Sequence, residues 1–352
     1  MKTVKKLDEI YDSVWWPDHL MGWIPDVLWK PDKIELAKFQ NSSHIFLETF
    51  TLMAAVASHT SKAQLGSLVT ESFRRHPAMI AQAFLTLDHI SKGRTILGIG
   101  AGEAENIVPY GINWKSPAKR LEESIEVIRL LWSGKKVDYD GEIWKLKDAI
   151  LSLPPEKEGN YPPIWVGAHS KKTMEITGRL GDGWIPEHLE IDEYFDKLKK
   201  IREVAEKAGR EPDDIAPALF TSLIICEEHE ECHRMFNSTA AKVYALLTPS
   251  ETYEKHGFKH PFGDFDAYKE YIPTKVNESE IISAINRVPE EICEHRYIHG
   301  NVDEVIHKIE QYAVKGLQHI VLWNLTPMCD YNKTKESFAA LLKVVNYFKD
   351  LK

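Results

Sequence analysis

Short apolar runs alternate with helix-type patterns along most of this chain, and this alternation constrains its fold more than any other feature. Buried strands that are each followed by an amphipathic helix are typical of a parallel sheet covered by helices. At 352 residues, the chain is long enough for one α/β barrel. Seven apolar runs are predicted to be strands: 13–16, 64–70, 95–100, 163–167, 183–186, 216–226 and 319–323.

The helices between these strands carry recognisable start signals, because proline follows His76 and Ser116 at the first helical position. Two regions interrupt the alternation. Residues 135–163 are predicted to form a hairpin and a proline-rich loop, and residues 230–300 a mostly helical insertion. Since no internal repeat is found, we expect a single domain over residues 1–352 with these two excursions.

Composition excludes several classes of partner. The 44 basic and 53 acidic side chains give a formal net charge of −9, which disfavours nucleic acids and anionic membranes. No apolar stretch has the length of a membrane span or the form of a secretory signal, so we expect a cytoplasmic protein with no membrane partner. The four cysteines show no C-x-x-C spacing, and buried thiols are expected rather than a disulfide or zinc framework.

Other titratable clusters admit structural interpretations. Residues 227–233 hold metal-ligand residue types, but a charged turn after a strand is the favoured interpretation. His295 and His299 lie near a predicted helix end and are expected to be structural. No metal site is therefore predicted. Arg74 and Arg75 are either a solvated pair or a clamp for the anionic tail of a ligand.

Chemical groups follow two of the predicted strands where each strand ends. His19 and Trp23 stand four residues apart after the first strand, and Glu103 follows the apolar run 96–102. In α/β barrels the carboxyl ends of the strands hold the active site, so an acid or base at two strand ends suggests a reaction centre. The three glycines between 98 and 102 lack the spacing of a dinucleotide-binding fingerprint.

Three longer motifs accompany these residues: FRRHPAMIAQ at 73–82, RLEESIEVI at 120–128 and GRLGDGW at 178–184. Together they make the chain resemble the luciferase-like family of (β/α)8 barrels, which bind flavin or the deazaflavin coenzyme F420. The implied fold is an α/β, TIM-barrel-like structure. Within the family, the chain is similar to the F420-dependent dehydrogenase and reductase branch, which includes glucose-6-phosphate dehydrogenases and phthiodiolone ketoreductase-like proteins.

The resemblance implies roles for individual residues. His19, Trp23 and Glu103 match the catalytic trio of the branch. The peptide bond between Ser67 and Leu68 falls where the branch has a non-proline cis bond behind the deazaflavin ring. The expected coenzyme contacts are Asp18, Ser67, Leu68, Thr70, Ala101, Gly102, Asn106, Gly167, Ala168, His169 and Ser170. The expected substrate contacts are Glu187, Glu190, Lys255 and Arg296.

The implied reaction is hydride transfer between deazaflavin C5 and an alcohol or carbonyl substrate. Imidazole ordinarily titrates near pH 6.5, so His19 is expected to act as base for the alcohol proton. Glu103 is expected to act as acid, and Trp23 to exclude water. Glu190 replaces a cation of the sugar-phosphate-binding relatives, so a small neutral or singly charged substrate is favoured over a sugar phosphate.

Several alternatives stay open. FMN is the less favoured coenzyme, and a luciferase-like FMN monooxygenase is one alternative function. A methylenetetrahydromethanopterin reductase-like enzyme is a second, and a non-catalytic coenzyme-binding barrel is a third. Only twelve residues precede Ser13, so the first strand of the family is expected to be missing or truncated. We expect a homodimer, and either its interface or the first ten residues to shield the open edge of the sheet.

Overall fold

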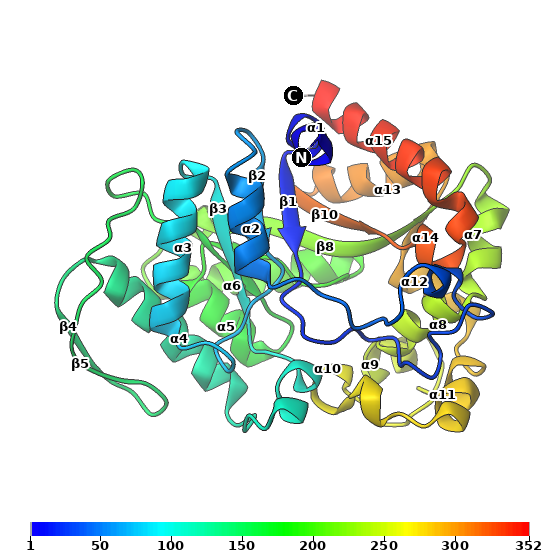
Figure 1. The fold of residues 1–352 in the computed structure, drawn as a ribbon, viewed down its shortest axis with the longest axis horizontal. Helices are drawn as coiled ribbons and strands as arrows, with labels where there is room; N and C mark the ends of the chain where they lie inside the picture. The colour runs from blue at the N-terminus through cyan, green and yellow to red at the C-terminus, as the bar shows by residue number, and fades with distance from the viewer. Residues whose placement is uncertain (1, 352) are drawn as a thin grey trace. The chain divides into compact units, whose positions relative to one another are not determined.

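The computed structural model describes residues 2–351, which divide into two compact units. The first unit contains residues up to His19 together with Leu47–Gly102 and Tyr110–Leu219. The second contains Leu20–Phe46, Glu103–Pro109 and the chain from Phe220 onward. Hydrogen-bonded strands follow the order β1-β2-β3-β6-β7-β8-β10, and β9 also pairs with β8. Strand β8 begins in the first unit and ends in the second (Figure 1).

The strands of the first unit are parallel, and their carboxyl ends are in register. Trp16 lies opposite Ser67, and Gly100 lies opposite Gly167. All six residues of β3 are buried, as expected for a strand covered on both faces. The strands are β1 (Ser13–Trp16), β2 (Gln64–Ser67), β3 (Thr95–Gly100), β6 (Ile164–Gly167), β7 (Gly183–Trp184) and the beginning of β8 (Ala216–Ile225).

The helices of the first unit pack in series, each of α2 to α5 against the next along the chain (Figure 1). The predicted start of α3 is confirmed, since the His76 ring accepts a hydrogen bond from the Ala78 N–H and Pro77 is the first helical residue. The helices are α1 (Lys2–Ile10), α2 (Thr49–Ala57), α3 (Pro77–Ser91), α4 (Pro117–Trp132), α5 (Lys171–Leu180) and α6 (Ile191–Lys207), with the short 3₁₀ helices η3 (Val108–Tyr110) and η4 (Pro212–Asp214).

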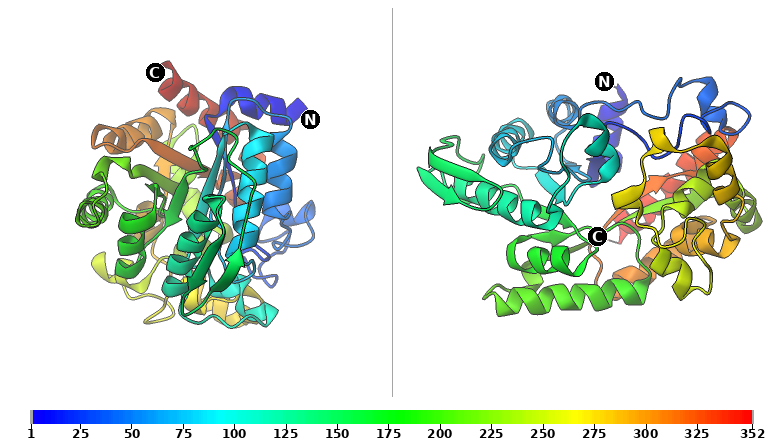
Figure 2. Two further views of the ribbon diagram at one scale, coloured as in Figure 1. Left: turned by 90° about the vertical axis from the view of Figure 1, so that its left-hand side faces the viewer. Right: turned by 90° about the horizontal axis from the view of Figure 1, so that it is seen from below.

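The predicted hairpin within 135–163 is confirmed as β4 (Val137–Asp140) and β5 (Lys145–Ala149), which pair antiparallel. The hairpin projects away from the sheet of its unit (Figure 2). Its turn is held by the Glu123 carboxylate, which accepts hydrogen bonds from the backbone N–H groups of Glu142, Ile143 and Trp144.

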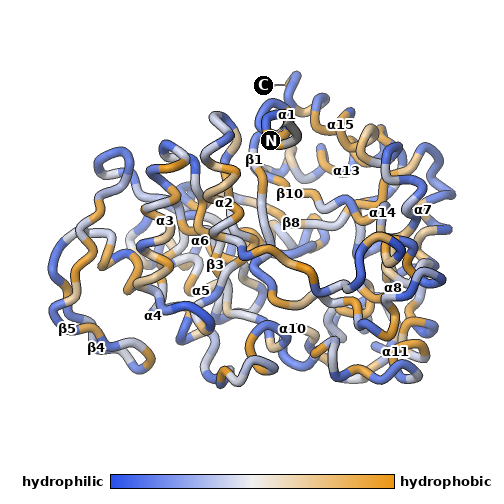
Figure 3. Tube along the Cα trace, in the orientation of Figure 1, coloured by the Kyte–Doolittle hydropathy of each residue, from blue (hydrophilic) through white to orange (hydrophobic). Residues whose placement is uncertain are grey.

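The second unit is mainly helical, as predicted for residues 230–300. Its strands are the end of β8, β9 (Ile298–Gly300) and β10 (His319–Asn324). Along α15, hydrophilic and hydrophobic residues alternate, and its apolar side contributes Leu341 and Val344 to a cluster with Ile298 of β9 (Figure 3). The helices are α7 (His229–Phe236), α8 (Thr239–Leu246), α9 (Ser250–Lys255), α10 (Ala267–Glu270), α11 (Glu278–Ile285), α12 (Glu290–Arg296), α13 (Val302–Val314), α14 (Thr326–Cys329) and α15 (Thr334–Asp350), with 3₁₀ helices η1 (Glu35–Lys38), η2 (Ala104–Asn106), η5 (Pro273–Lys275) and η6 (Tyr331–Lys333).

Each of the seven predicted strand ranges contains a strand, but two predictions about local structure were wrong. Strand β9 was missed because it has only three residues. The charged turn predicted at 227–233 is a bend only at Glu227 and Glu228, after which α7 begins at His229. Acidic residues in the first turn of α7 and buried Cys232, Met235 and Phe236 on its inner face favour the helix.

The described segment before Ser13 forms the helix α1 and not a strand. The buried Asp8 carboxylate fixes α1 to the chain leading into β2, where it accepts hydrogen bonds from the backbone N–H groups of Ser61, Lys62 and Ala63. Among the described residues, no helix has the length and apolar character needed to cross a membrane. The single domain expected from the sequence stays a prediction.

Candidate active site

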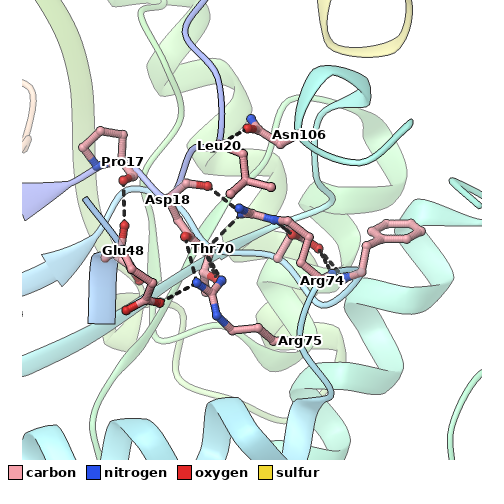
Figure 4. Close-up of polar contacts among 12 residues, drawn as sticks. Pro17, Asp18, Leu20, Glu48, Thr70, Arg74, Arg75 and Asn106 are labelled. Carbon is pink, nitrogen blue, oxygen red and sulfur yellow. Dashed lines mark hydrogen bonds and ion pairs between the residues drawn. The ribbon is translucent and has the colours of Figure 1, made fainter. Parts of the chain in front are cut away.

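Asp18 ties the end of β1 to the segment that follows β2. Its buried carboxylate accepts hydrogen bonds from the Thr70 hydroxyl at 2.6 Å and from both terminal nitrogens of Arg75 at 2.5 and 3.1 Å. Arg74 donates to the backbone carbonyl of Asp18 at 2.5 Å (Figure 4). These contacts fix the backbone immediately before His19, so Asp18 positions the predicted base.

The two arginines beside Asp18 are not the solvated pair that was one of the two sequence interpretations, and the clamp for an anionic ligand stays a prediction. Their side chains are mostly buried and paired within the protein, Arg74 with Glu71 and Arg75 with both Asp18 and Glu48. In the structure they clamp carboxylates of the first unit instead of forming a solvated pair. Both terminal nitrogens of Arg75 contact the Asp18 carboxylate, a bidentate pairing that fixes the geometry of this strand end.

Beyond β2, the non-proline cis peptide lies between Leu68 and Val69, one residue later than the sequence prediction at Ser67 and Leu68. The neighbouring glycines of β3 make room for this segment. A Cβ on Gly98 would overlap the Ser67 carbonyl oxygen, and one on Gly100 would lie 2.8 Å from Val69 Cγ2. Gly98 and Gly100 therefore allow β3 to pack closely against the segment that follows β2.

The ends of β6 and β7 meet through two hydrogen bonds. The Trp184 indole donates to the Ala168 carbonyl at 2.8 Å, and the Glu187 backbone N–H donates to His169 Nε2 at 3.1 Å. A predicted coenzyme contact, His169, thus lies against a predicted substrate contact, Glu187. Ser170 caps α5, where its hydroxyl accepts from the Thr173 N–H at 3.2 Å.

In the second unit, Asn106 holds the beginning of the segment that leads to Trp23. Its Oδ1 accepts hydrogen bonds from the backbone N–H groups of Leu20 at 2.7 Å and Met21 at 3.3 Å (Figure 4). The Tyr271 hydroxyl donates to the Trp23 carbonyl at 2.9 Å. The Trp23 ring packs edge-on against Tyr244, with centroids 5.8 Å apart. Trp23 is therefore fixed at both its backbone and its indole.

Glu105 is a functional candidate that sequence reasoning missed. Burial raises the pKa of Glu105 well above its ordinary value, although hydrogen bonds with Glu103 and Asn106 act to lower it. Asn106 Nδ2 donates to Glu105 Oε1 at 3.1 Å. A carboxyl group whose pKa is raised and that is hydrogen-bonded to Glu103 can share or pass a proton. Glu105 lies in a short polar segment, so hydropathy gave no sign that it is buried.

The predicted substrate residues come from several helix ends. Lys255 is the last residue of α9 and Arg296 the last of α12. The adjoining residues His256 and His295 stack with ring centroids 3.5 Å apart, so the two basic helix ends meet within the second unit. In the first unit, Glu190 is the residue before α6.

Several expected coenzyme contacts of the first unit lie at one edge of its sheet. The expected contacts Asp18, Thr70, Gly102 and Gly167 follow the carboxyl ends of the four adjacent strands β1, β2, β3 and β6. This edge is where ligands bind in α/β barrels. These expected contacts offer a ligand a carboxylate, a hydroxyl group and glycine backbone at one edge of the sheet.

Comparisons with known proteins agree with this architecture. The luciferase-like monooxygenase family matches residues 6–319. The phthiodiolone/phenolphthiodiolone dimycocerosates ketoreductase of Mycobacterium tuberculosis is 34% identical over 319 residues, covering 89% of this chain and 84% of the relative. The 5,10-methylenetetrahydromethanopterin reductase of Archaeoglobus fulgidus is 29% identical, covering 77% of this chain and 80% of the relative.

A solved structure supports the fold. The F420-dependent secondary alcohol dehydrogenase in complex with an F420-acetone adduct superposes with a TM-score of 0.74 at 22% identity, over 97% of this chain and 92% of that chain. At this identity the likeness concerns the fold alone. It confirms the predicted TIM-barrel-like α/β class.

Proposed function

Because this chain belongs to the luciferase-like monooxygenase family, we propose that it is an F420-dependent oxidoreductase that interconverts an alcohol and a carbonyl compound. The observation that carries the proposal is that His19 follows the carboxyl end of β1 and Glu103 that of β3, where the resemblance predicts a catalytic trio with Trp23. The 34% identity to a ketoreductase over most of both chains supports the carbonyl chemistry. We start from the membership of the chain in this family of oxidoreductases, and we propose the coenzyme and the substrate class.

The residues at the strand ends of the first unit are the proposed coenzyme contacts, from Asp18 and Thr70 to the backbone of 167–170. A bound deazaflavin would supply or accept the hydride, and the protein contributes orientation and proton transfer. Asp18 is already engaged by Thr70 and Arg75. Its proposed contribution to binding is therefore to hold Thr70 and the β1 end in place.

His19 is proposed to accept the hydroxyl proton when an alcohol is oxidised and to return it when a carbonyl is reduced. Glu103, hydrogen-bonded to Glu105, is proposed to exchange a proton with the ring-nitrogen side of the coenzyme. Burial favours the protonated form of Glu105, which can pass its proton to Glu103. Trp23, fixed by Tyr271 and Tyr244, is proposed to exclude water from the hydride path.

The substrate is proposed to be a small neutral or singly charged alcohol or ketone. Lys255 and Arg296 provide two positive charges at adjoining helix ends. Glu190, by resemblance, stands where sugar-phosphate-binding relatives have a third cation, and its negative charge opposes a phosphate.

Two other functions remain as alternatives. The identity to a methylenetetrahydromethanopterin reductase favours a pterin substrate as the second candidate. An FMN monooxygenase is the third, because the family name describes that activity. Titration calorimetry with F420, FMN and NAD separates the coenzymes. Tightest binding of F420 is the expected result, and tighter binding of FMN with oxygen consumption would contradict the proposal.

A further inference from the structure

Three histidines that have no proposed part in hydride transfer lie close together in the second unit. His229 and His233 stand one turn apart on the same face of α7, and His299 is the middle residue of β9. Each offers a ring nitrogen, and these three atoms lie within 4.8 Å of one another. Helix α7 packs against β9, so the fold itself brings the two elements together.

The outward-facing nitrogen of each ring is held by an oxygen atom. His229 Nδ1 lies 3.1 Å from Glu304 Oε2, and His233 Nδ1 lies 2.7 Å from Glu290 Oε1. His299 Nδ1 lies 3.3 Å from the Tyr297 carbonyl. Ionised carboxylates and carbonyls only accept hydrogen bonds, so each Nδ1 is the donor of its ring, and the Nε2 of a neutral ring has a lone pair for a metal ion.

Two of these Nε2 atoms lie close together. The Nε2 atoms of His229 and His233 are 3.0 Å apart, a separation at which two lone pairs repel unless a cation or a shared proton lies between them. Tetrahedral zinc with Zn–N bonds of about 2.0–2.1 Å separates its nitrogen ligands by about 3.4 Å. Small rotations of the imidazole rings therefore suffice to place the Nε2 atoms of His229 and His233 and a ring nitrogen of His299 around one ion.

The surroundings of the three histidines suit a doubly charged cation. Glu290 and Glu304 provide the carboxylates that orient metal-bound histidines in many proteins. Their negative charges would also balance the charge of the ion.

We infer that His229, His233 and His299 form a binding site for a divalent transition-metal ion, with zinc as the ion of choice. Three imidazole nitrogens and one open position, filled by water, match zinc and its neighbours in the Irving–Williams series rather than magnesium or calcium. The ion would fasten α7 to β9. Through Glu290 and Glu304 it would also hold α12 and α13, so its role is to stabilise the second unit.

The test uses the full chain after treatment with a chelator. Calorimetric titration with zinc chloride is expected to give one ion per chain. His233→Gln and His299→Gln are each expected to abolish saturable binding, and Glu290→Gln to weaken it by about 10–100-fold, as for other residues that orient a ligand. His307→Gln is the matched control, because His307 is an exposed histidine of the same unit, and its zinc affinity is expected to equal that of the unmodified chain.

Two further measurements guard against variants that fail to fold. With chelator present, all variants are expected to unfold at the temperature of the unmodified chain. Added zinc is expected to raise that temperature only where the three histidines are intact. Cobalt(II) in place of zinc is expected to give the visible absorption of a tetrahedral site. Unchanged zinc binding in His233→Gln would overturn the inference. It would also be overturned if the unmodified chain bound no zinc at micromolar concentration, in which case only a shared proton lies between His229 and His233.

Discussion

Asn106 Oδ1 accepts a 2.7 Å hydrogen bond from the backbone N–H of Leu20, which joins the turn that carries Glu103 to the residue that follows His19. Within the second unit, the bond fixes the backbone of Leu20 to the turn that contains Asn106. Sequence resemblance assigned Asn106 to the coenzyme, and the structure gives it a second task in positioning the backbone.

Replacing Asn106 by alanine removes the acceptor for Leu20 and for the buried N–H of Met21. An unsatisfied buried N–H costs about 1–3 kcal/mol, so the free energy of unfolding is expected to fall by about that amount. Because the His19 segment loosens, kcat is expected to fall more than coenzyme affinity. Urea unfolding and steady-state kinetics measure the two effects. Loss of coenzyme binding with unchanged stability would instead identify Asn106 as a ligand contact alone.

His19→Ala and Glu103→Gln are each expected to lower turnover by about 10²–10⁴-fold, the usual contribution of a general acid or base. Coenzyme affinity is expected to stay nearly unchanged, because neither side chain is proposed to anchor the coenzyme. Circular dichroism checks the fold of each variant, and calorimetry its coenzyme affinity. A variant that loses coenzyme binding or its fold can still retain its turnover per bound coenzyme. That result would show that the replaced residue has a structural role and not a catalytic one.

Glu105→Gln tests the buried carboxyl group. Burial raises the pKa of Glu105 in the folded protein, so between its ordinary and raised pKa the folded state binds more protons than the unfolded state. Stability from this group is then present at low pH and is lost as the pH rises. Since glutamine stays neutral, the stability of Glu105→Gln relative to the unmodified chain is expected to increase from pH 5 to pH 8. Urea unfolding at both pH values measures it, and a constant difference would contradict the assignment.

Asp8 gives the opposite pH dependence. Burial acts to raise its pKa, but hydrogen bonds from the backbone of Ala63, Lys62 and Ser61 outweigh this and lower it to about 2 from 3.8. The contribution to stability, about 2 kcal/mol, is therefore present above pH 4 and lost as the pH falls toward 2. Asp8→Ala is expected to destabilise the protein by about this amount at pH 7, whereas the exposed Asp264→Ala should not. Equal effects of the two substitutions would refute the role of Asp8.

The strand pattern was predictable because buried parallel strands are short, apolar and bounded by turn residues, as 95–100 shows. Strand β9 could not be predicted, since three residues are too few to show the two-residue alternation of a strand. The strand ends with His19 and Glu103 could be found from the sequence, but Glu105 could not, because a buried carboxyl group in a polar turn looks exposed. The histidines of α7 and β9 were separated by 66 positions between His233 and His299, and only the fold brings them together.

Glu190→Lys tests the proposed substrate class. Replacing one negative by one positive charge restores the three cations of sugar-phosphate-binding relatives, if Glu190 has the position that the resemblance gives it. Activity on glucose 6-phosphate is expected to rise in Glu190→Lys and to be poor in the unmodified chain. Steady-state assays compare both proteins with sugar phosphates and simple secondary alcohols. Efficient oxidation of glucose 6-phosphate by the unmodified chain would contradict the proposed substrate class.

The central claim is that this chain transfers hydride to and from F420. The most direct measurement follows the visible absorbance of oxidised F420 when the purified protein and a panel of secondary alcohols are added, with His19→Ala as the control. The account predicts that the absorbance bleaches with at least one alcohol and that the matching ketone restores it, at a rate that falls steeply in His19→Ala. Tight binding of F420 without any bleaching, or bleaching at equal rates in both proteins, would contradict the account.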